Sequence, residues 1–181
     1  NKLTQFEKQR NTIRRLWNID QHTAHFLYMQ TRIIQPASIL EIGTSNGFST
    51  FWLASAAIKF HGKIETIEVD KNRFELAQKN LKGIPNIKMH FGLAENIIPK
   101  LQNSYQLVFI DAGKIGYITY IKLLLDKISH DAVIIADNVI SHQSTVQEYL
   151  DFMKKSVLFE TITLPIGDGL EISRRKENKN E

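Results

Sequence analysis

The sequence predicts an α/β protein with a doubly wound, mostly parallel sheet of seven strands, helices on both faces and an antiparallel C-terminal strand. Two observations lead to this prediction. Strand-like and helical patterns alternate as far as residue 155, and a short glycine turn joins the last two predicted strands. Strands that alternate with helices form parallel sheets, because each helix carries the chain back across one face, whereas short turns join antiparallel neighbours.

The elements are predicted in order from apolar periodicity and from helix start and stop signals. Residues 2–17 and 20–34 form two amphipathic helices, with Asp20 as the N-cap of the second, and Pro36 precedes the first strand. Strands follow at 39–42, 63–69, 87–91, 107–110, 132–136, 158–164 and 170–173, and helices at 48–58, 72–81, 94–101, 115–128 and 143–153. We expect one domain over residues 1–181, with N-terminal helices in 1–35 and a basic, disordered tail over 174–181.

Composition restricts the class of protein. Hydrophobic residues make up 43% and charged residues 23% of the chain, which is near the globular average. The absence of cysteine excludes disulfides and thiolate metal sites, and no apolar run is long enough to span a bilayer. We therefore expect a soluble, cytoplasmic protein. The net charge of +4 is partly concentrated in the C-terminal residues, where a basic tail could contact phosphates or simply be solvated.

The stretch from Ile39 to Ser49 is the centre of the functional prediction. It combines an apolar strand, a turn that contains Gly43 and Gly47, and the start of a helix. Glycine permits a sharp turn and a close approach of a ligand, and the unpaired N–H groups of the helix face the same place. The spacing Glu-x-Gly-x-x-x-Gly differs from the dinucleotide fingerprint G-x-G-x-x-G, which disfavours an NAD-dependent dehydrogenase. An ordinary strand-to-helix turn is the alternative.

This motif resembles the first motif of the Rossmann-like S-adenosylmethionine methyltransferases. The resemblance implies that Glu41 and the loop from Gly43 to Gly47 meet the methionine part of the cofactor, and that Ser49 binds its carboxylate. Glu68 ends the second strand, where an acidic side chain can accept hydrogen bonds from the ribose hydroxyls. The Gly92-Leu93-Ala94-Glu95 segment follows the third strand, and we assign Ala94 to the adenine end of the same crevice.

A second constellation follows the fourth and fifth strands. Asp111 ends the fourth strand, and Asp137 and Asn138 end the fifth. If these strands are neighbours, the two carboxylates would repel unless a cation lies between them, and oxygen ligands favour Mg²⁺, with Mn²⁺ or Ca²⁺ as competitors. Lys114 follows Asp111 within one helical turn and could act as a base beside such an ion. Individually, two capping aspartates and a surface lysine would explain the same residues.

Taken together, residues 39–49, 66–70, 107–117, 134–139 and 165–170 resemble the cation-dependent O-methyltransferases of the catechol and caffeoyl-CoA type. The resemblance implies that Asp111, Asp137 and Asn138 bind the metal, with Asp111 also at the cofactor, and that Lys114 is the catalytic base. It also implies that Tyr117 shapes the site. The chain departs from the pattern at Gly113, in the short connection after Asn138 and in its brief N-terminal part, which leaves the acceptor and the oligomeric contacts open.

The sequence therefore predicts a methyltransferase that uses S-adenosylmethionine and a divalent cation to methylate a hydroxyl of a small catechol-like acceptor. Two alternatives stay open. One is methylation of a hydroxylated wobble uridine in tRNA, which the basic C-terminal residues 174–176 and the pI near 9.2 favour. The other is a cofactor-binding protein without catalysis. The apolar stripes of the first two helices suggest a homodimer.

Overall fold

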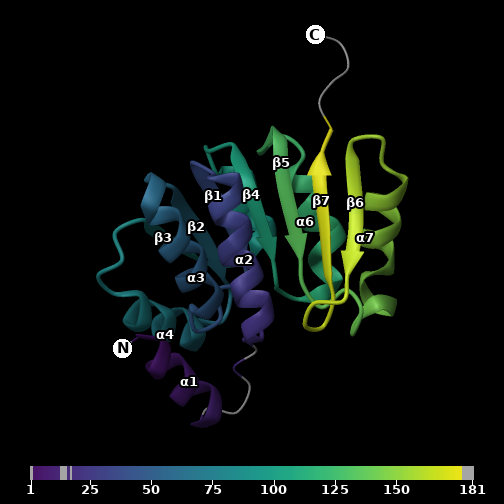
Figure 1. Ribbon diagram of the computed structural model, residues 1–181. Coiled ribbons are helices and arrows are strands. Elements are labelled where there is room, and N and C mark those ends of the chain that lie inside the picture. The colour runs from purple at the N-terminus through teal and green to yellow at the C-terminus, as the bar shows by residue number, and fades with distance from the viewer. Residues whose placement is uncertain (1, 13–15, 17, 177–181) are drawn as a thin grey trace.

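The computed structural model describes residues 2–12, 16 and 18–176 of the chain. A single sheet of seven strands lies between two layers of helices, with the strand order β3-β2-β1-β4-β5-β7-β6 (Figure 1). The strands are β1 (Ser38–Ile42), β2 (Lys63–Glu68), β3 (Ile87–Phe91), β4 (Tyr105–Ile110), β5 (Ile128–Ala136), β6 (Phe159–Leu164) and β7 (Leu170–Arg175). The helices are α1 (Lys2–Thr12), α2 (Gln21–Ile34), α3 (Phe48–Ala57), α4 (Lys71–Leu81), α5 (Ala94–Ile97), α6 (Tyr117–Leu124) and α7 (Gln143–Lys155), with the short 3₁₀ turns η1 (Ile58–Phe60), η2 (Ile98–Lys100) and η3 (Lys114–Gly116).

The predicted fold class is confirmed. Strands β1 to β5 pair in parallel, and β7 pairs antiparallel with both β5 and β6. Successive side chains of the central strands enter opposite cores: Ile39 and Phe109 pack beneath α1 to α4, whereas Leu40 and Ile110 pack beneath α5 to α7. This alternation explains why the central strands are apolar throughout, because both faces of a parallel sheet are covered.

Three predicted helices end earlier in the structure. The helix expected over 94–101 is α-helical only from Ala94 to Ile97 and continues as the 3₁₀ turn η2. The helix expected over 115–128 ends at Leu124, and Ile128 already pairs with Tyr105 as the first residue of β5. The apolar spacing of Leu124 and Ile128 fits a helix and a strand equally well, so only pairing with β4 decides between them. The first helix, expected over 2–17, ends at Thr12, and residues 13–15 and 17 of that prediction lie outside the described residues.

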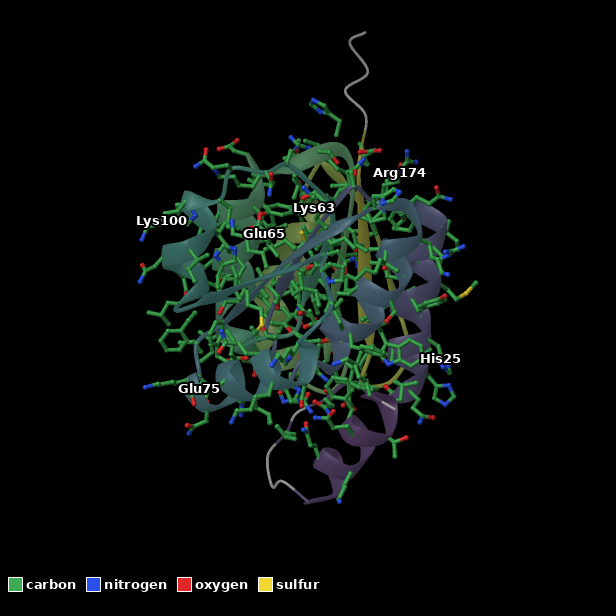
Figure 2. All side chains as sticks on the ribbon, turned by 90° about the vertical axis from the view of Figure 1, so that its left-hand side faces the viewer. His25, Lys63, Glu65, Glu75, Lys100 and Arg174 are labelled. Atoms are coloured by element: carbon green, nitrogen blue, oxygen red, sulfur yellow. The ribbon has the colours of Figure 1, made fainter. Side chains whose placement is uncertain are left out.

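The disordered basic tail was predicted to begin at residue 174, but the last strand extends to Arg175. Arg174 and Arg175 belong to β7, where Arg174 pairs with Val133, and residues 177–181 lie outside the described part of the chain. The Arg175 guanidinium donates to the carbonyl oxygens of Leu125 and Ile128 at 3.1 and 2.9 Å. Since β7 is antiparallel, this end of the strand lies beside the amino ends of the parallel strands (Figure 2 shows Lys63 and Arg174 at one end of the molecule, opposite α1).

Among the described residues, none of the helices combines the length and the apolar character that crossing a bilayer requires.

Candidate active site

The loop between β1 and α3 lies against the carboxyl ends of the neighbouring strands. The backbone N–H groups of Gly43 and Thr44 donate to the carbonyl oxygen of Ile67 at 3.0 and 3.2 Å. A Cβ at Gly43, which has φ +104°, would lie 2.0 Å from the carbonyl oxygen of Asp111. Only glycine can therefore place this turn so close to the end of β4.

A cavity of about 560 Å³ opens over this loop and over the carboxyl ends of β1, β2, β4 and β5. Seven of the residues singled out from the sequence line it: Gly43, Glu68, Ala94, Asp111, Lys114, Asp137 and Asn138. Parallel strands end at the same edge of a sheet, so residues far apart in the sequence meet there.

Three of the predicted cofactor residues do not line the cavity. Gly47 begins α3 at φ +88°, and a Cβ there would lie 2.9 Å from the side chain of Leu81, so this glycine serves helix packing. Glu41 and Ser49 are buried beneath the loop, and the Ser49 hydroxyl faces the Glu41 carboxyl group, one of the contacts that lower its pKa. In this structure Ser49 contacts Glu41, and its contact with the cofactor carboxylate stays a prediction.

Glu41 is a fully buried acid under the loop. Its Oε2 accepts hydrogen bonds from the hydroxyl groups of Thr50 and Thr66, the latter at 2.6 Å. Burial raises the pKa of Glu41 to about 7, and the nearby charge of Asp111 adds to the rise. The hydrogen bonds from the hydroxyl groups lower the pKa, but they do not offset the burial. The Oε1 atom of Glu41 has no hydrogen-bond partner among the described residues. The carboxyl group is thus held by one oxygen only.

Two more unpaired polar atoms lie in the same loop. The Ser45 hydroxyl and the Asn46 side-chain oxygen are buried and have no partner in the described part of the chain. Buried polar atoms are usually satisfied, and a group of three within six residues marks a place where a polar ligand can supply the missing bonds. The loop therefore fits a ligand with amino and carboxylate groups, such as the methionine part of S-adenosylmethionine.

Glu68 at the end of β2 has a defined orientation. Its carboxylate accepts hydrogen bonds from the backbone N–H groups of Ser45, Val69 and Asp70 at 2.7, 2.9 and 2.8 Å. Asp70 in turn caps α4 by accepting the N–H of Arg73. Because backbone donors hold the carboxylate in the cavity wall, its remaining acceptor capacity faces a ligand in the cavity.

The ends of β4 and β5 bring the two predicted acidic ligands together. Ile110 pairs with Ala136, so Asp111 and Asp137 leave adjacent strands at the same level. Burial, and then the charge of Asp111, raise the pKa of Asp137 to about 7, although its Oδ1 accepts the Asn138 N–H at 2.8 Å. A cation bound beside Asp111 and Asp137 would relieve the repulsion that raises the pKa of Asp137.

Asn138 completes this set of oxygen atoms. Its amide nitrogen donates to Asp168 Oδ2 at 3.4 Å, which leaves the amide oxygen available as a ligand. The described residues contain no group of three histidine, cysteine, aspartate or glutamate side chains that could hold a metal ion. A cation here would therefore depend on two carboxylates, one amide oxygen and oxygen atoms from outside the protein, which is a donor set that Mg²⁺ accepts.

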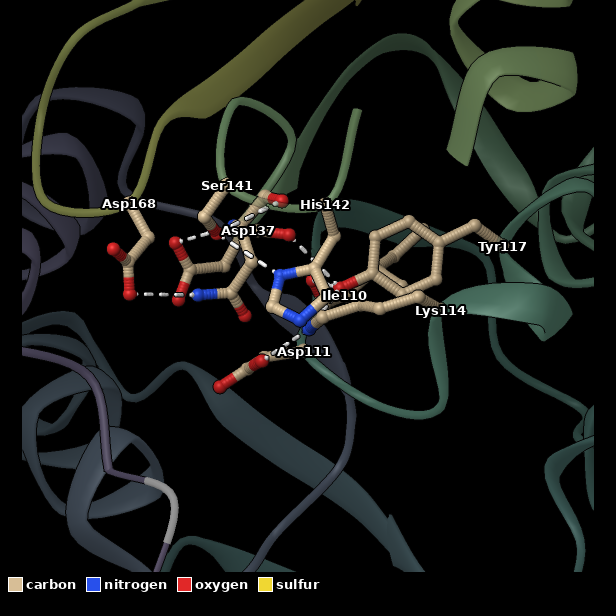
Figure 3. Close-up of polar contacts among 9 residues, drawn as sticks. Ile110, Asp111, Lys114, Tyr117, Asp137, Ser141, His142 and Asp168 are labelled. Atoms are coloured by element: carbon tan, nitrogen blue, oxygen red, sulfur yellow. Dashed lines mark hydrogen bonds and ion pairs between the residues drawn. The ribbon is translucent and has the colours of Figure 1, made fainter. Parts of the chain in front are cut away.

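Lys114 extends along the same wall (Figure 3). Its ammonium group donates to Asp111 Oδ1 at 2.9 Å and to the hydroxyl oxygen of Tyr117 at 2.8 Å. The Tyr117 hydroxyl has carbonyl acceptors at Ile110 (3.1 Å) and Asp137 (3.0 Å) for its own proton. Tyr117 is fully buried and lies behind the lysine, out of the cavity.

Several cavity residues were missed by the sequence analysis. They are polar side chains from the N-terminal connection, α4, the turn before α7 and the β6–β7 turn: Asn18, Asp20, Arg73, His142 and Asp168. The glycines around Asp168 indicated a turn, but its place at the site depends on long-range backbone hydrogen bonds, among them those from Ile140 and Ser141 to the Asp168 carbonyl oxygen. Glu95 belongs to the segment after β3 that was expected at this crevice, and it does line the cavity. The buried Oε2 of Glu95, the residue after Ala94, has no hydrogen-bond partner among the described residues.

Comparison with known proteins agrees with this geometry. The profile of a family described as O-methyltransferase matches residues 2–176. The chain belongs to this family. A catechol O-methyltransferase of Niastella koreensis is 32% identical over 138 residues, which is 72% of this chain and 62% of that protein. A caffeoyl-CoA O-methyltransferase of Medicago sativa is 30% identical over 195 residues, which is 91% of this chain and 78% of that protein.

The chain is shorter than some of its O-methyltransferase relatives. It spans 62% of the Niastella koreensis enzyme and 54% of a catechol O-methyltransferase of Mycobacterium tuberculosis, to which it is 38% identical over 119 residues. Among solved structures, a methyltransferase of Podospora anserina with bound S-adenosylhomocysteine has a TM-score of 0.90 at 21% identity, over 97% of this chain and 88% of that one. This likeness shows that the O-methyltransferase fold is present over nearly the whole chain.

Proposed function

We propose that this protein is an O-methyltransferase that uses S-adenosylmethionine and a divalent cation to methylate a hydroxyl of a small acceptor with a neighbouring oxygen, such as a catechol. One observation carries the proposal: Lys114 and the Asp111–Asp137 pair line the same cavity as Glu68 and the β1–α3 loop. A base, a candidate cation site and a candidate cofactor site thus share one space. The family and the names of its relatives support the same reaction.

The cofactor would lie along the carboxyl ends of β1 and β2. The unpaired hydroxyl of Ser45 in the cavity wall suits its amino-acid end, and the Glu68 carboxylate suits the ribose hydroxyls. The unpaired Glu95 Oε2 in the cavity wall suits an amino group such as that of adenine. When bound, S-adenosylmethionine supplies an electrophilic methyl group on a sulfonium.

The cation would be held by Asp111, Asp137 and Asn138. When bound, it neutralises the carboxylate pair and lowers the pKa of an acceptor hydroxyl that it contacts. Asp111 has a second role, because it also holds the Lys114 ammonium group. The acceptor must therefore present one oxygen to the candidate cation site and the reacting hydroxyl to Lys114, which is the arrangement of a vicinal diol.

In its neutral amine form, Lys114 would take the proton of the reacting hydroxyl and become an ammonium group. The acceptor oxygen would then bond to the methyl group that S-adenosylmethionine supplies as the C–S bond breaks, which leaves S-adenosylhomocysteine. Asp111 and Tyr117 hold the lysine nitrogen from two sides, so its position is set before the acceptor enters. The protein accelerates the reaction mainly by holding donor and acceptor at reacting distance.

The small acceptor takes precedence over tRNA because of where the basic residues lie. Arg175 is bound to the carbonyl oxygens of Leu125 and Ile128, at the end of the sheet away from the cavity. The cavity wall itself contains Asp20, Asp111, Asp137 and Asp168, which disfavours a polyanion.

We also propose a homodimer, as the first two helices suggested. Met29 and Ile33 on α2 are 54% and 67% exposed, which is unusual for side chains of this size on one helix. Size-exclusion chromatography with light scattering of the protein and of Ile33→Glu tests it: a monomeric mass for the unchanged protein contradicts the dimer.

A methyl-transfer assay with catechol, caffeate and unmethylated tRNA, each with Mg²⁺ or with EDTA, tests the proposed reaction. We expect turnover of a small diol with Mg²⁺, loss of turnover with EDTA, and unchanged binding of S-adenosylhomocysteine in both. Asp137→Asn should lower turnover, whereas Asp131→Asn on the exposed amino half of β5 should not. Full turnover without a divalent cation contradicts the metal role, methylation of tRNA alone contradicts the small acceptor, and cofactor binding without any turnover favours the non-catalytic alternative.

A further inference from the structure

Four amide side chains from three separate segments meet behind the β1–α3 loop. Gln5 and Gln9 come from α1, Asn46 from the loop itself, and Asn80 from the last turn of α4. We call these four residues the amide cluster. Asn80 is its centre, with only 1% of its surface exposed.

Every hydrogen-bonding position of the Asn80 amide is used. Its Oδ1 accepts from Gln5 Nε2 at 2.8 Å and from Gln9 Nε2 at 2.9 Å. Its Nδ2 donates to Gln9 Oε1 at 2.8 Å and to the backbone carbonyl oxygen of Asn46 at 2.8 Å. A side-chain amide has two donor hydrogens and two acceptor lone pairs, so the removal of any partner leaves at least one of these four positions of the buried amide unused.

The bond to Asn46 links the amide cluster to the wall of the cavity. The neighbouring Ser45 lines the cavity, has φ +50°, and donates its backbone N–H to Glu68 Oε2 at 2.7 Å. Movement of the Asn46 backbone would move this N–H away from Glu68. Gln5, Gln9 and Asn80 do not themselves line the cavity, so they can affect a ligand only through the loop.

Helix α1 has a second attachment that does not depend on the amides. The Phe6 ring packs on the rings of Phe48 and Phe51, with centroids 5.5 and 5.7 Å apart. Phe6 is buried almost completely. The helix can thus stay docked when one amide is removed, and the amide cluster supplies a polar connection that packing alone does not give.

We propose that Asn80 is a positioning residue for S-adenosylmethionine. Asn80 and Gln9 connect the docked helix α1 to the backbone of Asn46. This connection keeps the neighbouring Ser45 N–H bonded to Glu68, in the arrangement that binds the cofactor. The inference rests on the cofactor part of the proposed function. It requires neither the metal nor a particular acceptor, because the affinity for the cofactor product reports on it directly.

Calorimetric titration with S-adenosylhomocysteine tests the proposal on the full chain. We expect Asn80→Ala and Gln9→Ala each to raise the Kd by about fivefold or more, the lower range of coupling between sites. The double variant should be no weaker than Asn80→Ala alone, because both residues act through one connection. Gln147→Ala removes an amide that donates to Asp151 on the exposed side of α7 and should leave the Kd unchanged.

Thermal unfolding separates positioning from a general loss of stability. Met153→Ala, in the core beneath α7 and far along the chain from the loop, should lower the unfolding temperature and leave the Kd unchanged. The proposal is overturned if Asn80→Ala and Gln9→Ala unfold at lower temperature but bind with the unchanged Kd, or if Met153→Ala weakens binding as much as they do. If Asn80→Ala does not fold, Gln9→Ala decides alone. Failure of the unchanged protein to bind would instead remove the proposed cofactor, and this inference with it.

Discussion

The ammonium nitrogen of Lys114 lies 2.8 Å from the hydroxyl oxygen of Tyr117, a residue one helical turn further along the chain. The hydroxyl is buried, and burial together with the charges of Asp111 and Asp137 raises the pKa of Tyr117 well above its usual range. The hydroxyl therefore stays protonated and donates a hydrogen bond to a backbone carbonyl oxygen. Its oxygen is then free to accept the hydrogen bond from the Lys114 ammonium group. Tyr117 fixes where the proposed base stands.

Tyr117→Phe should lower kcat by about tenfold and leave the affinity for S-adenosylhomocysteine unchanged. The ring keeps its edge contact with Tyr149, at 5.7 Å between centroids, but one of the acceptors that hold the lysine is lost. An effect of this size corresponds to one hydrogen bond to a charged group. Steady-state kinetics and calorimetry provide the measurement. An unchanged kcat would show that Asp111 alone positions the lysine.

Lys114→Ala should lower kcat by about 10²- to 10⁴-fold, the usual contribution of a positioned base. Cofactor affinity should change little, because the lysine bonds to Asp111 and Tyr117 rather than to the Glu68 carboxylate that is proposed to hold the cofactor ribose. Lys122→Ala is the matched control, since this α6 lysine is exposed and pairs with Glu148. Retention of most of the turnover in Lys114→Ala would remove the lysine from the mechanism.

Glu68→Ala should raise the Kd for S-adenosylhomocysteine by about tenfold or more. The change removes a carboxylate that both faces the proposed ribose position and receives three backbone N–H groups. Glu75→Ala, an exposed acid on α4, is the control. An equal Kd for Glu68→Ala and the unchanged protein would mean that the ribose lies elsewhere in the cavity.

Glu41 should make the free protein less stable as the pH rises from about 4.5 to about 7. Its pKa in the folded state is raised from 4.5 to about 7, so over this interval the folded state keeps a proton that the unfolded chain has released. Stability falls with pH wherever the folded state binds more protons, and a shift of this size corresponds to about 3 kcal/mol at full effect.

The measurement is denaturant unfolding at pH 5 and pH 8. Glu41→Gln should lose less stability between these two values than the unchanged protein does, because glutamine does not titrate. Glu160→Gln, an exposed acid on β6, should behave like the unchanged protein. If Glu41→Gln loses as much stability between pH 5 and pH 8 as the unchanged protein does, titration of Glu41 does not cause the loss.

Sequence patterns placed the strand ends well because buried parallel strands leave a strong local signal. The β1–α3 stretch is apolar, then glycine-bearing, then helical, and Asp111 and Asp137 follow runs with no polar interruption. The same local logic failed for the boundary between α6 and β5, where one apolar spacing fits two structures. It failed again for Arg174 and Arg175, whose charge resembled a solvated tail although their backbone completes β7.

Contacts between residues far apart in the sequence could not be predicted from the local pattern. Nothing near Asn80 in the sequence indicates that its amide would join α1 to Asn46, 34 positions away. Ser49 stood at the expected position of a cofactor ligand, yet the direction of its side chain depends on how α3 packs over Glu41. Both outcomes depend on the relative placement of separate elements.

The sequence by itself determined the class of fold, the edge of the sheet where a ligand would bind and the acidic residues at that edge, because strand ends are set by local apolar runs and glycine turns. The tertiary structure decided which of those side chains face the cavity, which are buried beneath it and which distant residues hold the loop. The physical reason is that side-chain direction and burial follow from packing between elements, and packing is a property of the whole chain.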